Sequence, residues 1–255
     1  MKHFIHPDFL LSNKASRELY HNFAAEAPII DYHCHLPPAE VAGDKRWENM
    51  TRVWLGGDHY KWRAMRSNGI DERFITGDAP DREKFQKFAE TMPYLLRNPL
   101  FDWSQLELAR YFDVFERLSP ATAEKIWLST SEQLAQPEFS ARGFMTRSNV
   151  KLVCTTDDPA DTLEHHAQVK ASGFGTQVLP TWRPDKALAL DRPAFWNGWL
   201  DRLAAAANMR VQTWDDLLSA LQKRHAFFAE NGCRLSDYGL DTVYAEPYTE
   251  AEIRA

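Results

Sequence analysis

Four short apolar segments, each followed at once by polar or turn-forming residues, constrain the fold of this 255-residue chain more than any other feature. They cover residues 28–33, 150–155, 177–181 and 233–236. Nearly continuous apolar runs of this length are typical of strands in a parallel sheet, where helices cover both faces. Polar residues gathered after such strands indicate a functional site at their carboxyl ends. The pattern therefore predicts an α/β fold with a parallel sheet.

Helical patterns fill the intervals between these strands. One covers residues 160–171, and another follows an approximate capping box at Thr213–Asp216. More than a hundred residues separate the first strand from the second, where a single crossover needs only a few tens. We expect an inserted helical subdomain in that interval. Its predicted helices cover residues 45–55, 59–67, 82–96, 103–112 and 121–136.

The composition excludes several classes of protein. The net charge is −6 and the lysines and arginines are scattered, which argues against binding to nucleic acid or to an anionic membrane surface. The three cysteines lie far apart at Cys34, Cys154 and Cys233, so we expect no disulfide framework and a reducing compartment. No apolar run approaches the length of about 18 residues that a membrane span needs. By elimination, we expect a soluble cytoplasmic protein.

Two histidines, His33 and His35, lie at the end of the first predicted strand. Alternate side chains of a strand share a face, so both imidazoles would point toward one ion or substrate. Two imidazoles do not complete a metal site, and the pair could equally be a polar strand end with satisfied hydrogen bonds. By contrast, His165 and His166 are neighbours in a predicted helix and face different directions, so we do not expect them to share an ion.

Four further segments could carry chemistry, each with a structural alternative. Tyr60 could transfer a proton, although the neighbouring Asp58 at a helix start is explained by capping alone. Thr155–Pro159 could bind a ligand, but we favour capping of the following helix. Arg183, held between two prolines, suits a carboxylate or phosphate, or else an internal salt bridge. Asp237 could be a general base or a strand-end turn residue.

Taken together, longer motifs resemble uronate isomerase, the glucuronate/galacturonate isomerase branch of the amidohydrolase superfamily. The resemblance runs in order from about Phe9 to the last residue. The motifs cover residues 31–38, 57–66, 76–79, 82–85, 98–100, 106–108, 155–159 with 165–166, and 182–186.

The resemblance implies a distorted (β/α)8 TIM barrel with a helical insertion after the first strand. Family members are nearly twice as long, so this chain would supply about the first four βα units. Residues 1–36 and 150–255 would form the barrel part, and residues 37–149 the inserted helical subdomain. Four such units cannot close an eight-stranded barrel, and residues 249–255 look like the start of a further helix. We therefore expect an incomplete protein.

The resemblance also implies interconversion of D-glucuronate with D-fructuronate, and of D-galacturonate with D-tagaturonate, through a cis-enediol. This reaction needs a base, a group that polarises the carbonyl oxygen and a cation for the distant carboxylate. By resemblance, His33 and His35 are ligands of a divalent metal, with zinc as the expected ion. Tyr60 and Asp237 are active-site groups that transfer protons or orient hydroxyls. Arg183 faces the uronate carboxylate.

Some positions depart from the family pattern. Asp102–Gln105 stands where His-Trp-Thr-His is usual, Tyr238 replaces a histidine, and Ala109 replaces an arginine. The family's later catalytic groups would follow residue 255, so we expect this chain alone to bind metal weakly and not to isomerise. A metal-dependent hydrolase is an alternative, although such enzymes often carry a lysine where this chain has residues 236–239. A non-catalytic fragment is another alternative, and self-association into a homo-oligomer is left open.

Overall fold

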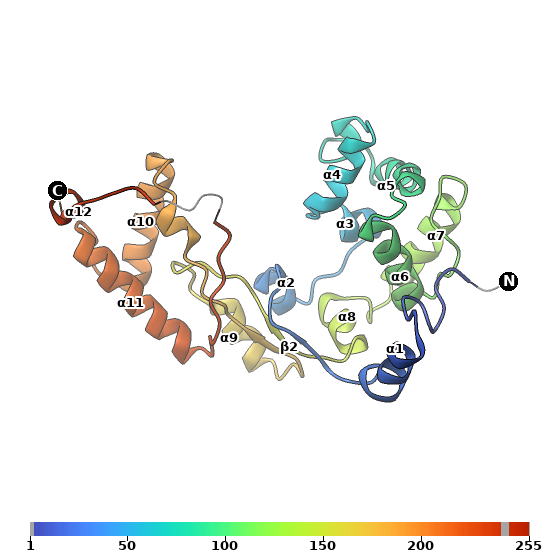
Figure 1. The fold of residues 1–255 in the computed structure, drawn as a ribbon, viewed down its shortest axis with the longest axis horizontal. Coiled ribbons are helices and arrows are strands. Elements are labelled where there is room, and N and C mark those ends of the chain that lie inside the picture. Colours follow the sequence, from blue (N-terminus) through green and yellow to red (C-terminus); the bar gives the residue numbers. More distant parts are fainter. Residues whose placement is uncertain (1–2, 241–244, 255) are drawn as a thin grey trace. The chain divides into compact units, whose positions relative to one another are not determined.

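The computed structural model describes residues 3–240 and 245–254 (Figure 1). The chain divides into two compact units, which are described separately. The helical unit comprises Met1–Ala27 and Asp44–Arg147, and the sheet unit comprises Pro28–Gly43 and Ser148–Ala255. The predicted division into a barrel part (residues 1–36 and 150–255) and a helical insertion (residues 37–149) refers to the complete barrel. It remains a prediction.

The sheet unit contains a three-stranded parallel sheet, as the apolar segments predict. Its strands are β1 (Ile29–Asp31), β2 (Val150–Cys154) and β3 (Gln177–Leu179), in the order β1-β2-β3. Ile30 pairs with Leu152, and Val153 with Val178. Backbone bonds continue past the strand ends, because Thr155 donates its N–H to the Leu179 carbonyl at 3.0 Å. The polar residues after the strands are therefore held in register.

The fourth predicted strand, residues 233–236, is present only as a short parallel contact. Trp182 donates its N–H to the Leu235 carbonyl, and Asp237 donates its N–H to the Trp182 carbonyl, both at 3.0 Å. This is an isolated bridge between Trp182 and Ser236. The segment lies beside the continuation of β3, but the pairing is too short to be a strand.

Five α-helices of the sheet unit lie within the described residues. They are α2 (Pro38–Ala42), α9 (Glu164–Ala171), α10 (Pro193–Ala207), α11 (Trp214–Glu230) and α12 (Glu250–Arg254), with a 3₁₀ turn η4 (Asp185–Leu188) before α10. The predicted capping box at Thr213 and Asp216 is confirmed at the start of α11. Helix α9 begins four residues later than predicted, because Leu163 adopts a left-handed conformation with φ 59°. Helix α10, which packs against α11, was not predicted.

The helical unit matches the predicted interval of helices, with differences at their ends. Its elements are α1 (Lys14–Leu19), which continues as the π-helix η1 (Tyr20–Ala24), α3 (Met50–Trp54), α4 (His59–Ser67), the 3₁₀ turn η2 (Glu72–Phe74), α5 (Asp81–Thr91), the 3₁₀ turn η3 (Met92–Tyr94), α6 (Pro99–Phe112), α7 (Ala123–Leu134) and α8 (Ala141–Arg147). Helix α4 has the predicted bounds. Helix α3 covers only the second half of predicted helix 45–55, because Arg46 instead forms an antiparallel bridge with Ser140.

One apolar cluster fills the helical unit. Phe85 and Phe88 on α5 are buried, and the ring of Trp54 from α3 packs against both. Helix α5 contacts α3, α4 and α7, so it lies at the centre of this cluster.

No helix among residues 3–240 and 245–254 combines the length and apolar character that crossing a bilayer requires.

Candidate active site

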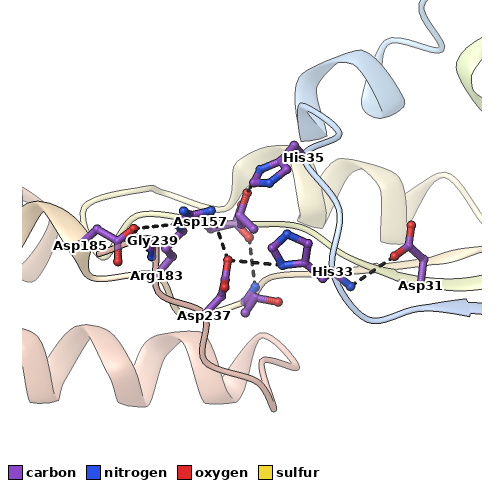
Figure 2. Close-up of polar contacts among 10 residues, drawn as sticks. Asp31, His33, His35, Asp157, Arg183, Asp185, Asp237 and Gly239 are labelled. Atoms are coloured by element: carbon purple, nitrogen blue, oxygen red, sulfur yellow. Dashed lines mark hydrogen bonds and ion pairs between the residues drawn. The ribbon is translucent and has the colours of Figure 1, made fainter. Parts of the chain in front are cut away.

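His33, Arg183 and Asp237 meet beyond the carboxyl ends of the strands in the sheet unit (Figure 2). Asp237 Oδ2 lies 3.4 Å from His33 Nδ1 and 3.2 Å from Arg183 Nη1. These three residues follow β1, β3 and the 233–236 segment, so the strand-end pattern of the sequence brings them together as predicted.

His35 lies beside His33, and strand geometry accounts for only part of this arrangement. The two ring centroids are 4.9 Å apart, with the planes nearly perpendicular at 89°. Strand β1 ends at Asp31, so the backbone between the histidines is held differently: Cys34 donates its N–H to the Cys154 carbonyl at 3.0 Å. His35 Nδ1 lies 3.1 Å from the Thr156 hydroxyl, which ties it to the end of β2. At His35, the structure therefore has the hydrogen-bonded polar strand end that the sequence analysis gave as the alternative to a metal site.

Arg183 is held by an internal ion-pair network. Its Nε donates to Asp185 Oδ2 at 2.8 Å while its Nη1 faces Asp237. Gly239 donates its N–H to the same Asp185 oxygen at 2.9 Å, and a Cβ at Gly239 would displace the guanidinium. The salt-bridge alternative for Arg183 is therefore realised, and Gly239 is a supporting residue that the sequence did not reveal.

Asp237 presents an acceptor whose bonding is incomplete. Its Oδ2 is buried and makes no hydrogen bond, because the neighbours at 3.2 and 3.4 Å approach in poor geometry. An acceptor of this kind can take a proton, orient a hydroxyl or bind a cation. This buried atom lies against both an imidazole and a guanidinium.

A second polar network, around His166, lies in the same unit and was not predicted. The Thr155 hydroxyl donates to Asp157 Oδ2 at 2.6 Å and lies 2.8 Å from His166 Nε2. Since the hydroxyl proton is used toward Asp157, His166 Nε2–H is the donor to Thr155. Asp157 Oδ2 also accepts the Thr181 N–H at 3.1 Å. The network therefore ties the end of β2 to the continuation of β3.

Burial controls the protonation of this network. Burial lowers the pKa of His166 to about 4, with smaller effects from Asp161 and His165. Burial also raises the pKa of Asp157, against the hydrogen bonds from Thr155 and Thr181. His166 Nδ1 is buried without a hydrogen-bond partner. The His165 side chain is 40% exposed and the His166 side chain only 7%, so the two histidines face apart as expected.

The prediction that Thr155–Pro159 caps the following helix is wrong. Leu163 is the N-cap of α9 and provides no side-chain hydrogen bond. Asp157 instead bonds across to Thr181, and Asp158 Oδ1 accepts the Ala160 N–H and the Trp199 indole N–H, both at 2.9 Å. Both aspartates stabilise the loop after β2 rather than a helix end. The sequence signal that could have revealed this loop is the Thr-x-Asp pattern of residues 155–157, directly after a buried strand.

The donor types near His33 suit a divalent cation. Two imidazoles and a carboxylate oxygen without a hydrogen bond are ligands that zinc accepts. Within the part of the chain that the structure describes, no three His, Cys, Asp or Glu side chains are arranged as an ion site. The residues therefore fit a metal in kind, and a closed shell would need a further ligand.

Tyr60 belongs to the helical unit. It lies in the first turn of α4, where the Asp58 carboxylate accepts the N–H groups of Tyr60 and Lys61. The capping role predicted for Asp58 is confirmed. Burial raises the pKa of Asp58, but its contacts with Lys61 outweigh this and lower it overall. The Tyr60 ring is exposed, with the Arg63 guanidinium 5.6 Å from its centroid.

Four departures from the family pattern lie in described surroundings, and the first, Asp102 on α6, is half-buried. Gln105 on α6 is buried and accepts the Leu118 N–H at 3.0 Å, which is a structural contact within the helical unit. Ala109 is buried on the same helix. Tyr238, next to Asp237, is exposed.

Comparison with known proteins gives one consistent family. The profile of the glucuronate isomerase family (UxaC) matches residues 1–255. A uronate isomerase of Bacteroides thetaiotaomicron is 55% identical over 100% of this chain and 55% of its own length. One of Cellvibrio japonicus is 57% identical over 99% of this chain and 54% of its own length. This chain thus spans about half the length of the curated relatives it matches.

Solved structures agree with these matches. The uronate isomerase of Thermotoga maritima is 36% identical, with a TM-score of 0.88 over 93% of this chain and 52% of that protein. The glucuronate isomerase of Caulobacter crescentus is 26% identical, with a TM-score of 0.87 over 97% of this chain and 54% of that protein.

Proposed function

The chain belongs to the glucuronate isomerase family, and on this premise we propose that it supplies part of a uronate isomerase. The proposed reactions interconvert D-glucuronate with D-fructuronate and D-galacturonate with D-tagaturonate. The observation that carries the proposal is the meeting of His33, Arg183 and Asp237 at the strand ends of a chain that matches the family over its whole length. Carboxyl ends of parallel strands are where β/α enzymes bind their substrates.

The proposed fold is an amidohydrolase-type (β/α)8 barrel. The parallel order β1-β2-β3, with residues 233–236 beside the continuation of β3, suits about the first four βα units of such a barrel. The remaining units would come from the part of the relatives' length that this chain does not span. The three cysteines are free thiols, which suits a cytoplasmic enzyme of carbohydrate metabolism.

The proposed chemistry is proton transfer between neighbouring carbons of a sugar acid. A base removes the C2 proton, the cis-enediol forms, and a proton is returned to C1. Asp237 Oδ2 is an acceptor without a hydrogen bond, so we assign it to proton transfer or to holding a substrate hydroxyl. Tyr60, whose ring is exposed, is the second proton-transfer candidate. Arg183 would bind the uronate carboxylate through the part of its guanidinium that the two aspartates leave open.

His33 and His35 would hold a divalent cation, with zinc as the expected ion. When bound, such an ion polarises a carbonyl oxygen and so stabilises the charge that develops there. The two rings lie 4.9 Å apart, centroid to centroid, and Asp237 Oδ2 is 3.4 Å from His33 Nδ1. The imidazoles and this carboxylate oxygen are therefore donors of the right kind, and a bound ion would need a further ligand.

The test compares this chain alone with this chain fused to the unmatched carboxyl-terminal part of the Bacteroides relative. Ketose formation from glucuronate and galacturonate is followed with and without added zinc. We expect turnover from the fusion and none from the chain alone. Replacement of His33 by Ala, Tyr60 by Phe or Arg183 by Gln should each lower kcat/KM of the fusion at least about a hundredfold. A folded, metal-loaded fusion without turnover would refute the proposed reaction.

A further inference from the structure

The helical unit contains a cavity of about 700 Å³. Of its lining residues, the proposed reaction uses only Tyr60. The cavity is lined by residues of α4, the segment after α5 and the start of α6, including Tyr60, Arg63, Tyr94 and Trp103. Cavities that bind small molecules usually measure about 300–1,000 Å³. The cavity therefore has room for a monosaccharide.

The charge of the cavity favours an anion. Arg63 is its charged lining residue, and no Asp or Glu is among the described residues that line it. Within residues 3–240 and 245–254, no carboxylate forms an ion pair with Arg63, whose recorded contact is the Tyr60 ring at 5.6 Å. By contrast, Arg66 on the same helix is paired with Glu72 at 2.6 Å. An exposed guanidinium without an acidic partner is suited to bind a carboxylate by two parallel hydrogen bonds.

The walls of the cavity suit a sugar ring. Tyr60, Tyr94 and Trp103 are 58%, 75% and 55% exposed, respectively, so their rings are accessible to a ligand. The C–H face of a pyranose packs on such rings. Asn68 and Asn98 also line the cavity and can exchange hydrogen bonds with hydroxyl groups. An apolar face beside a few polar groups is the usual composition of a ligand site.

We propose that this cavity binds a sugar acid, with its carboxylate on Arg63 and its ring on Trp103. The choice of ligand class rests on the proposed function. Arg63 differs from Arg183 in one respect that matters for binding: Arg183 already pairs with Asp185 and Asp237. The cavity thus offers a second guanidinium whose charge is available to a ligand.

The test uses the whole 255-residue chain and follows the indole N–H signal of Trp103 by NMR, assigned with Trp103→Phe. Titration with D-glucuronate should shift this signal saturably, and D-glucose, which lacks the carboxylate, should bind at least about tenfold more weakly. Arg63→Gln should weaken glucuronate binding about tenfold or more. Arg66→Gln, on the same helix but outside the cavity, should leave the titration unchanged.

Three results would overturn the proposal: no response of Trp103, an equal response to glucose, or loss of the response in Arg183→Gln but not in Arg63→Gln. The amide spectrum of each variant establishes that it is folded. The result for the cavity can be distinguished from the result for the proposed reaction. Turnover by the fusion with a silent Trp103 would remove the cavity proposal alone, and a responding Trp103 without turnover would remove the reaction alone.

Discussion

The helical unit and the sheet unit bury their apolar residues in different ways. In the helical unit one cluster of the described residues joins α3 to α7, and residues such as Phe88 are completely buried in it. In the sheet unit, Trp199 and Phe228 are equally buried but belong to separate clusters. At the edge of the sheet, β1 leaves the apolar side chain of Ile30 63% exposed.

The difference in burial predicts a difference in stability between the two units. Strands of parallel sheets are normally covered on both faces, and β1 is not. The helical unit closes its core within residues 50–139, whereas the sheet unit pairs β1 with β2, more than a hundred residues further along the chain. We therefore expect the helical unit to be the more stable of the two in this chain.

The largest effect should come from emptying one core at a time. Phe88→Ala should lower the free energy of unfolding of the helical unit by about 3–5 kcal/mol, because it removes a fully buried ring. Phe228→Ala, equally buried, should act on the sheet unit by a similar amount. Calorimetry should show two transitions, with each variant shifting a different one. A single transition lowered equally by both variants would contradict the comparison.

A smaller effect should follow from the pKa of His166. In the unfolded chain His166 takes up a proton near its ordinary pKa of 6.5, but in the folded sheet unit burial holds its pKa at about 4. Protons therefore favour the unfolded state between these values, and stability should fall by about 3 kcal/mol as the pH drops from 6.5 to 4. Asp157, whose pKa is raised, acts in the opposite direction in this range and reduces the net change.

His166→Gln isolates this contribution. Glutamine keeps an N–H donor for Thr155 but does not titrate. Denaturant unfolding of both proteins at several pH values should give a flatter profile for the variant in the transition of the sheet unit. Identical pH profiles would mean that His166 does not titrate across this range on unfolding.

The sequence predicted elements best where local signals were complete. Helix α4 begins at its capping Asp58 and α11 at its capping box, as expected. Helix α3 is shorter than predicted because Arg46 pairs with Ser140, a residue distant in sequence. Local propensity cannot report such a long-range backbone contact.

The site shows the same limit. The strand-end rule indicated that His33, Arg183 and Asp237 would meet, and they do. The rule could not show that Arg183 is shared by two aspartates, because that depends on the turn that brings Gly239 to Asp185. It also could not show that His166 is buried against Thr155, since the helical pattern of residues 160–171 carries no information about what packs on each face.

The smallest expected effect tests the open edge of the sheet unit. Ile30→Thr should change the free energy of unfolding of this chain by less than about 0.5 kcal/mol, because the side chain is mostly exposed. The matched control is Val153→Thr in the neighbouring β2, where 2% exposure means that the new hydroxyl is buried at a cost of about 1–3 kcal/mol. In the fusion that adds the rest of the relatives' length, Ile30→Thr should become as costly as Val153→Thr, because further strands would cover β1. Urea unfolding of both variants and their unsubstituted parent, in the short chain and in the fusion, measures these losses. Equal losses from both variants in the short chain would show that β1 is already covered there.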